Sequence, residues 1–169
     1  MKALTDEFIL KAKKIKLLLT DCDGVLTDAG TYYSNSGEEM KRFSIRDGMG
    51  VERLRHLVSI ETGIITGEAS YIVRKRARKL GINECHCGIS DKYLKFKEIL
   101  ETKRISPAEV AYIGDDTNDM EIMKHAGLSA CPADAFSSII EIADIVADSK
   151  GGHGAFRDFA EMIIDCQLK

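Results

Sequence analysis

Short apolar runs rich in β-branched residues alternate along the chain with segments of helical periodicity. The runs lie at residues 15–20, 60–66, 110–114, 128–131 and 145–147. Apolar residues recur at helical spacing in residues 5–13, 47–58, 69–80, 91–102 and 156–163. Parallel strands need crossover connections, and helices then cover both faces of their sheet. The alternation therefore predicts an α/β fold with a Rossmann-like parallel sheet and helices on both faces.

The length and charge of the chain exclude several classes of function. A chain of 169 residues suits one domain, residues 1–169. Its net charge of -3 provides no positive field for nucleic acid or an anionic membrane. No run is long and apolar enough for a membrane span or a signal peptide, so we expect a cytoplasmic protein. The five cysteines include no C-x-x-C pair, which argues against a disulfide framework and a zinc site.

One element interrupts the alternation after the first strand. Residues 31–34 and 38–44 have the pattern of two strands joined by a turn that contains Gly37. This β-hairpin is expected to project over the carboxyl ends of the parallel strands, where open α/β sheets bind their ligands. A two-stranded ribbon is marginally stable alone. The sequence therefore predicts a partner for it, such as the same ribbon of another subunit.

Acidic residues follow two of the predicted strands. Asp21 and Asp23 come directly after the first, and Asp115, Asp116 and Asp119 come after the third. Each group has a simpler interpretation, since Asp23 suits a turn and the later acids suit a helix cap or first turn. Like charges this close are tolerable with a cation between them, and oxygen ligands of this kind suit Mg²⁺. Together the groups predict a divalent-cation site.

Two further signals fall in the same series of strand ends. Thr66 and Gly67 end the second strand and offer a hydroxyl and a backbone N–H to a phosphate. Lys92 opens a helix, where the helix dipole disfavours a cation. A lysine of this kind is usually just solvated. Beside two acidic groups, it is a candidate for holding an anionic substrate.

The order D-x-D-G-V-x-T, I-T-G, a lone Lys92 and G-D-D-x-x-D resembles the haloacid dehalogenase-like phosphohydrolases. The resemblance implies that Asp21 attacks phosphorus and forms an aspartyl-phosphate. It also implies that Asp23 protonates the leaving alcohol and then activates water.

The same resemblance implies the remaining roles around the metal. Mg²⁺ would be bound by the Asp21 side chain, the Asp23 backbone carbonyl and Asp115. Asp116 and Asp119 would orient these ligands. The transferring phosphoryl group would be held by Thr66, Gly67 and Lys92.

The segments between these motifs are too short for a cap domain. With the hairpin, residues 44–50 and residues 151–159, the chain resembles the capless 3-deoxy-D-manno-octulosonate 8-phosphate phosphatases. That resemblance implies a homotetramer acting on a small sugar-acid phosphate in lipopolysaccharide precursor synthesis. Arg46 and Arg157 are then candidates for binding the sugar acid, because guanidinium binds carboxylate through two bonds.

The length of the sugar stays open. Glu68, with Arg76 and Lys79, is similar to the sister branch that acts on nine-carbon ulosonate 9-phosphates such as N-acylneuraminate 9-phosphate. Arg46 in its R-D-G-x-G segment is similar to the octulosonate branch, which we prefer. Glu68, Arg76 and Lys79 also fit an exposed helix face.

Two alternatives come from other classes of protein. A response-regulator receiver also gathers acids, a threonine and a lysine, but we expect its lysine to follow the acids, whereas Lys92 precedes Asp115. A non-catalytic tetramerisation domain would have lost acidic residues. The retention of Asp21, Asp23 and Asp115 argues against it.

Overall fold

The computed structural model describes residues 5–169, and its centre is a six-stranded sheet in the order β5-β4-β1-β6-β7-β8. All strand pairs in this sheet are parallel. The strands are β1 (Leu17–Thr20), β4 (Glu61–Thr66), β5 (Glu84–Cys87), β6 (Val110–Ile113), β7 (Leu128–Cys131) and β8 (Ile145–Val146). The predicted fold class is confirmed, including the absence of a cap domain.

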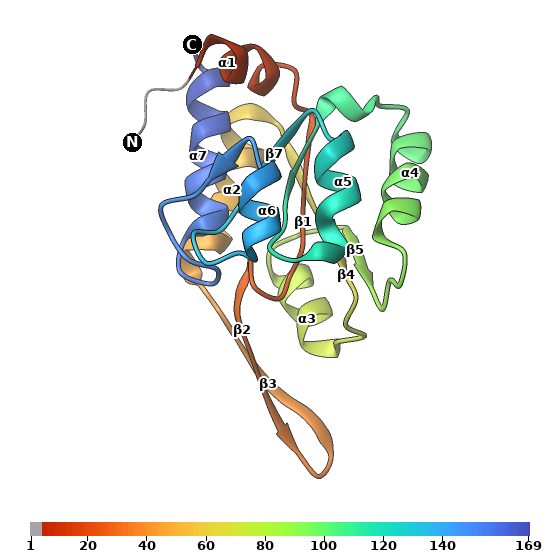
Figure 1. The fold of residues 1–169 in the computed structure, drawn as a ribbon. Coiled ribbons are helices and arrows are strands. Elements are labelled where there is room, and N and C mark those ends of the chain that lie inside the picture. The colour runs from red at the N-terminus through yellow and green to blue at the C-terminus, as the bar shows by residue number, and fades with distance from the viewer. Residues whose placement is uncertain (1–4) are drawn as a thin grey trace.

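Helices cover both faces of the sheet (Figure 1). One face packs against α1 (Asp6–Ala12), α2 (Ile45–Val58), α3 (Tyr71–Lys79) and α7 (Ala155–Gln167). The other packs against α4 (Lys92–Lys103), α5 (Met120–His125) and α6 (Ser137–Ile142). Side chains alternate along a strand, so Leu18 joins the first core while Leu17 and Leu19 join the second. Full burial of each leucine stabilises the fold by about 1.5–3 kcal/mol.

Helix α1 packs on the body, as residues 5–13 predict. The Thr5 hydroxyl accepts a hydrogen bond from the backbone of Phe8, and Phe8 and Ala12 are buried. Gln167 of α7 donates to the carbonyl oxygens of Ala12 and Ile15. Within residues 5–169, no helix has the length and apolar character needed to cross a membrane.

Three elements are absent from the predicted series of strands and helices. Strand β5 has the sequence ECHC and is only half-buried at the sheet edge, so it lacks the apolar β-branched run of a central strand. Helices α5 and α6 each span only six residues, too few for a clear helical period. Strand β5 and helix α6 lie at or near the sheet edges, whereas α5 directly follows the acidic residues after β6, where the sequence indicates only a helix cap.

The hairpin of β2 (Thr27–Ser34) and β3 (Gly37–Phe43) projects from the body beyond the carboxyl ends of the parallel strands (Figure 1). Its first strand begins at Thr27, earlier than residue 31, because Thr27 pairs with Phe43 beyond a register irregularity between Thr27 and Thr31. The apolar side chains of Tyr32, Tyr33 and Met40 are exposed on it.

Candidate active site

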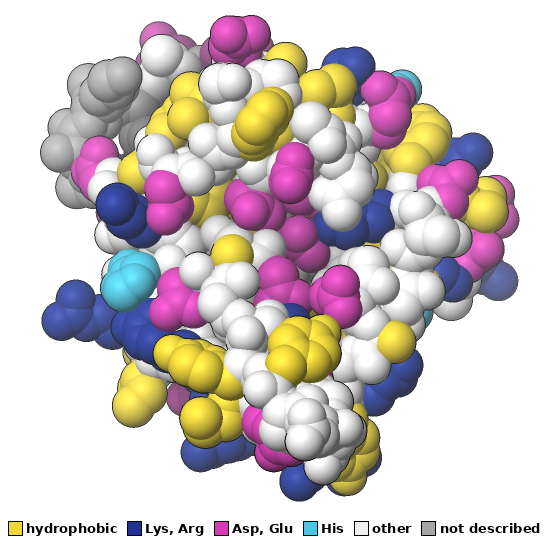
Figure 2. Space-filling view, turned by 60° about the horizontal axis from the view of Figure 1, so that its bottom comes forward, with side chains coloured by type: hydrophobic (Ala, Val, Ile, Leu, Met, Phe, Trp, Pro, Cys, Tyr) yellow, Lys and Arg dark blue, Asp and Glu magenta, His cyan; other side chains and the backbone are white. Residues whose placement is uncertain are grey.

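A cavity of ≈ 250 Å³ lies at the carboxyl ends of β1, β4 and β6. Its lining residues are Asp21, Asp23, Ala29, Thr66, Gly67, Glu68, Lys92, Asp115, Asp116 and Asn118. Figure 2 shows acidic side chains gathered in a hollow on this side of the molecule. A larger cleft of ≈ 680 Å³ lies near the amino ends of the strands, but it collects lysines rather than an acidic cluster. We therefore take the smaller cavity as the candidate active site because of its acidic lining, although its volume is smaller.

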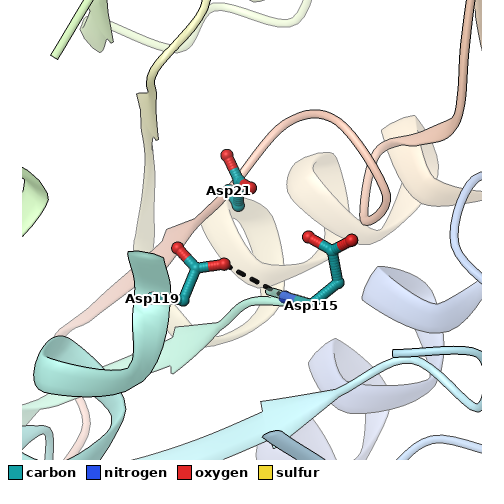
Figure 3. A group of neighbouring side chains, drawn as sticks. All are labelled: Asp21, Asp115 and Asp119. Atoms are coloured by element: carbon teal, nitrogen blue, oxygen red, sulfur yellow. Dashed lines mark hydrogen bonds between the residues drawn. The ribbon is translucent and has the colours of Figure 1, made fainter. Parts of the chain in front are cut away.

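Three carboxylates meet at this cavity, with Asp21 and Asp115 in its lining and Asp119 buried next to them (Figure 3). Asp21 follows β1 directly, and Asp115 and Asp119 follow β6. Each offers an oxygen that lies within 4.8 Å of the others. Strands β1 and β6 are hydrogen-bonded neighbours, so their carboxyl ends bring these acids together. Asp21 and Asp115 are thus close enough to share one cation.

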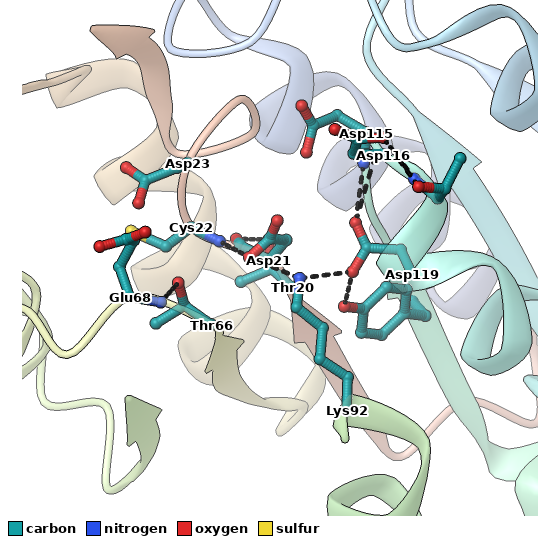
Figure 4. Close-up of polar contacts among 12 residues, drawn as sticks. Thr20, Asp21, Cys22, Asp23, Thr66, Glu68, Lys92, Asp115, Asp116 and Asp119 are labelled. Carbon is teal, nitrogen blue, oxygen red and sulfur yellow. Dashed lines mark hydrogen bonds and ion pairs between the residues drawn. The ribbon is translucent and has the colours of Figure 1, made fainter. Parts of the chain in front are cut away.

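Lys92 offsets part of this negative charge. Its side chain is 1% exposed, and its Nζ lies 3.0 Å from Asp21 Oδ1 and 2.7 Å from Asp119 Oδ1 (Figure 4). Burial alone would lower the pKa of Lys92, but the charges of Asp21 and Asp119 outweigh burial and raise it. The ammonium group therefore stays protonated, and Lys92 is not the solvated lysine of the simpler interpretation.

Protein donors already surround Asp119. Its Oδ1 accepts hydrogen bonds from Lys92 at 2.7 Å and from the Tyr112 hydroxyl at 2.6 Å. Its Oδ2 accepts the backbone N–H groups of Asp115 at 3.1 Å and Asp116 at 3.4 Å. A carboxylate with both oxygens engaged in this way positions its neighbours more readily than it binds an ion. We infer that Asp119 orients the site, as the sequence predicts.

Asp21 and Asp115 have oxygens left for a ligand. Asp21 Oδ1 accepts from the backbone of Cys22 at 2.7 Å as well as from Lys92, whereas no donor among residues 5–169 contacts Oδ2. Asp115 Oδ1 is buried without a hydrogen-bond partner in the same range. Two carboxylates with free oxygens fit a hard divalent cation such as Mg²⁺. The donor set thus matches the predicted metal.

The carboxylate of Asp116 caps the turn that follows it, and its role in orienting the metal ligands stays a prediction. It accepts from the backbone N–H of Thr117 at 2.6 Å and from the Thr117 hydroxyl at 3.2 Å. This is the capping role that the sequence left open, at the start of the short 3₁₀ turn η2 (Thr117–Asp119). Asp116 also contacts Asp119 through its backbone: its N–H donates to Asp119 Oδ2 at 3.4 Å, and its carbonyl oxygen accepts from the Asp119 N–H at 2.9 Å.

Burial and repulsion make the ionised acids unfavourable without a cation. Burial, followed by the charge of Asp119, raises the pKa of Asp115 to about 7, and the same two causes raise the pKa of Asp21 well above its usual range. The folded protein then holds protons that the unfolded chain releases near pH 4. Stability without metal should therefore fall as the pH rises from about 4 to 7.

We expect the melting temperature in chelator to be about 5 °C lower at pH 8 than at pH 5, as a loss of roughly 1–2 kcal/mol would give. Mg²⁺ should raise it more at pH 8 than at pH 5, because the cation binds the ionised acids. Differential scanning calorimetry with and without Mg²⁺ measures both effects. Equal melting temperatures at the two pH values, unaffected by Mg²⁺, would contradict the expected charge balance.

Gly24 gives Asp115 the space it occupies. Its φ of +87° suits glycine, and an added Cβ would lie 1.9 Å from Asp115 Oδ2. We expect Gly24→Ala to displace this carboxylate and lower turnover by about 10²-fold or more, as ångström-scale misplacement does. Gly81→Ala is the control, because Gly81 also has positive φ but meets only the Arg55 guanidinium. Steady-state kinetics at saturating Mg²⁺ compare them, and equal activity of both variants would contradict this role.

Asp23 lies apart from the three clustered acids (Figure 4). Its Oδ1 accepts from the Thr27 hydroxyl at 3.0 Å, and its Oδ2 lies 2.5 Å from Lys41 Nζ. The sequence does not indicate Lys41, because nothing in a hairpin strand shows which lysine turns toward the body. Tyr112 has the pattern of an ordinary core residue of β6, and only the structure shows its hydroxyl donating to Asp119.

Of the residues proposed for the substrate, Thr66, Gly67, Glu68 and Lys92 line the cavity. Thr66 ends β4, and its Oγ1 accepts from the backbone N–H of Glu68 at 3.3 Å. This loop places Glu68 next to Thr66 (Figure 4). These residues are therefore placed where a phosphoryl group and the adjoining part of a substrate would lie.

The other four proposed substrate residues do not line the cavity of this single chain. Arg76 donates to the carbonyl oxygen of Ser44 and lies over the Phe43 ring, and Arg157 pairs with Glu161 at 2.6 Å. Arg46 and Lys79 are exposed. A role for Arg46, Arg76, Lys79 and Arg157 in substrate binding therefore stays a prediction.

Known proteins share this fold and sequence. A family model described as haloacid dehalogenase-like hydrolase matches residues 62–157. The 3-deoxy-D-manno-octulosonate 8-phosphate phosphatase of Escherichia coli K12 is 42% identical over 163 residues, covering 96% of this chain and 86% of the relative. The corresponding structure from Yersinia pestis has a TM-score of 0.94 at 40% identity, covering 98% of this chain and 89% of that one.

A further structure carries ligands. The 3-deoxy-D-manno-octulosonate 8-phosphate phosphatase of Moraxella catarrhalis, in complex with magnesium, phosphate and KDO, has a TM-score of 0.93 at 33% identity. The match covers 98% of this chain and 94% of that one. The chain thus belongs to the haloacid dehalogenase-like hydrolases. Within them, it is a member of the 3-deoxy-D-manno-octulosonate 8-phosphate phosphatase family.

Proposed function

We propose that this protein is a Mg²⁺-dependent phosphatase that hydrolyses 3-deoxy-D-manno-octulosonate 8-phosphate. The observation that carries the proposal is the meeting of Asp21, Asp115 and Lys92 at the carboxyl ends of adjacent strands. Relatives of this name match nearly the whole chain. The activity would serve lipopolysaccharide precursor synthesis, as the family resemblance implies.

The first half of the reaction transfers the phosphoryl group to the enzyme. The free Oδ2 of Asp21 attacks phosphorus, and the bond to the sugar oxygen breaks. Asp23 gives its proton to that oxygen, so the sugar leaves as an alcohol. Lys92, the Thr66 hydroxyl and the Gly67 N–H hold the phosphoryl oxygens, since a phosphate dianion otherwise repels a carboxylate.

The second half regenerates Asp21. Asp23, now ionised, takes a proton from water as the water attacks phosphorus, and the acyl phosphate bond breaks. Inorganic phosphate leaves, and Asp23 is again protonated for the next turnover. Mg²⁺ would be held by Asp21, Asp115 and the Asp23 backbone carbonyl, and when bound it supplies positive charge that offsets the acids and the phosphate.

Phosphate release from the eight-carbon and nine-carbon ulosonate phosphates tests the proposal. We expect the higher kcat/KM with the octulosonate 8-phosphate. A preference for the nine-carbon substrate would transfer the assignment to the sister branch, which the position of Glu68 at the cavity also supports. No Mg²⁺-dependent activity on any sugar phosphate would favour a tetramerisation domain, and stable phosphorylation by acetyl phosphate would favour a receiver.

We further propose a cytoplasmic homotetramer whose subunits meet through the hairpins. Tyr32, Tyr33 and Met40 leave apolar surface exposed on a ribbon that is marginal alone. All five cysteines are free thiols, in keeping with a reducing compartment. Light scattering coupled to size-exclusion chromatography measures the assembly, and a monomer at micromolar concentration would contradict it.

A further inference from the structure

A buried ammonium group from the hairpin contacts the proposed acid–base residue. Lys41 lies on β3, and its side chain is 1% exposed. Its Nζ is 2.5 Å from Asp23 Oδ2 and 3.4 Å from Glu38 Oε2. Taking an ammonium group out of water is costly unless charged partners surround it, and these two carboxylates provide them. The burial of Lys41 therefore depends on its contact with Asp23.

The contact is anchored on the body of the protein. Glu38 Oε1 accepts a hydrogen bond from the hydroxyl of Ser70, which is buried at the start of α3. Ser70 in turn accepts from the backbone N–H of Val73 at 3.3 Å. A continuous series of contacts thus runs from the first turn of α3 through Glu38 and Lys41 to Asp23.

Both oxygens of Asp23 are held by residues of the hairpin. Thr27 of β2 donates to Oδ1, and Lys41 of β3 holds Oδ2. The core sheet, by contrast, provides the nucleophile Asp21 and its neighbour Asp115. The position of the acid–base carboxylate is therefore set by an element separate from the one that sets the nucleophile.

We propose that Lys41 is a positioning residue that holds the Asp23 side chain in place, so that its carboxylic acid form can give its proton to the leaving oxygen and its carboxylate form can then take a proton from water. This inference rests on the proposed phosphatase function. The step it assists is proton transfer from Asp23 to the alcohol oxygen as the phosphorus–oxygen bond breaks. A misplacement of about 1 Å in such a group costs on the order of 10²-fold in rate.

Two substrates whose leaving groups differ in basicity distinguish a positioning role of Lys41 from a purely structural one. A sugar alkoxide needs a proton in order to leave, whereas p-nitrophenolate leaves without one. In Lys41→Met we expect the first turnover of the sugar phosphate to slow by about 10²-fold. The first-turnover burst of p-nitrophenolate from p-nitrophenyl phosphate should stay within about threefold of the wild type, because it bypasses the assisted step. Rapid-quench and stopped-flow kinetics measure the two rates at saturating Mg²⁺.

Neighbouring glutamates of β3 supply matched variants. Glu38→Gln weakens the support of Lys41, and we expect it to slow the sugar phosphate several-fold while sparing the p-nitrophenolate burst. Glu39→Gln should behave as the wild type, because within residues 5–169 the carboxylate of Glu39 accepts a hydrogen bond only from the exposed Ser34. If Lys41→Met fails to fold, this pair carries the test.

Distinct outcomes overturn the inference and the proposed function. Equal slowing of both substrates in Lys41→Met, or wild-type rates on both, would overturn the role of Lys41. Equal effects of Glu38→Gln and Glu39→Gln would do the same. A wild-type protein that turns over neither substrate would instead overturn the phosphatase function itself.

Discussion

Replacing Asp21 by asparagine is expected to lower the rate of phosphate release by roughly 10⁴-fold or more, as the loss of other activated nucleophiles does. The amide cannot attack phosphorus, although it fills the same space beside Cys22 and Lys92. The variant should fold as well as the wild type in chelator. Burial and the charge of Asp119 raise the pKa of Asp21, so a neutral side chain relieves repulsion.

Acid quenching during turnover adds a direct measurement to this prediction. Phosphate should be found by mass spectrometry on the Asp21 peptide of the wild type and be absent from Asp21→Asn. Asp23→Asn should also be severely impaired, yet it should still accept phosphate from p-nitrophenyl phosphate because Asp21 is intact. Retained turnover in Asp21→Asn, with the fold verified by circular dichroism, would remove Asp21 from the nucleophile's role.

The centre of the fold could be predicted because its strands are buried on both faces. Strands β1, β4, β6 and β7 are largely apolar and, except at Glu61, buried at every position, and the hydrophobic effect allows such runs few other places. Strand β5 sits at an edge and is half-buried, so its sequence carries no comparable constraint. Its place follows from pairing with β4, a long-range contact that local pattern does not reveal.

The acids of the site could be predicted for a related reason. Parallel strands end at the same edge of a sheet, so residues directly after β1 and β6 meet once the strands pair. The role of Lys41 could not be predicted in this way, because it depends on how a twisted hairpin returns to the body. The capping contact of Asp116 depends on the local turn at Thr117, which the acidic motif alone leaves open.

The sequence could not show whether the arginines proposed for substrate binding lie at the cavity. Arg76 and Arg157 have partners within the chain, the Ser44 carbonyl and Glu161 respectively, and neither lines the cavity. These arginines are proposed from their positions along the chain. Whether a side chain extends into the cavity depends instead on the direction in which it points. If subunits meet through the hairpins as proposed, surfaces that one chain leaves outside its cavity become candidates to complete a neighbouring one.

Replacing Asp115 by asparagine should abolish the response to Mg²⁺ and lower turnover by at least about 10³-fold, at or beyond the loss from a single oxyanion-stabilising donor. Asp115 Oδ1 is buried with no hydrogen-bond partner in the described part of the chain, and burial with the charge of Asp119 raises the pKa of this acid to about 7. A neutral amide removes that repulsion, so the melting temperature in chelator at pH 8 should rise. The variant should therefore be more stable without metal and inactive with it.

Asp116→Asn is the matched control for this last prediction. It makes the same chemical change one residue along, and asparagine caps a helical turn about as well as aspartate. If Asp116 only caps the turn at Thr117, its variant keeps the Mg²⁺-induced rise in melting temperature that Asp115→Asn loses. Calorimetry of both variants across pH 5–8 distinguishes them, and a wild-type Mg²⁺ response in Asp115→Asn would place the cation elsewhere. Because the two carboxylates are sequence neighbours, only the direction of each side chain can account for opposite results.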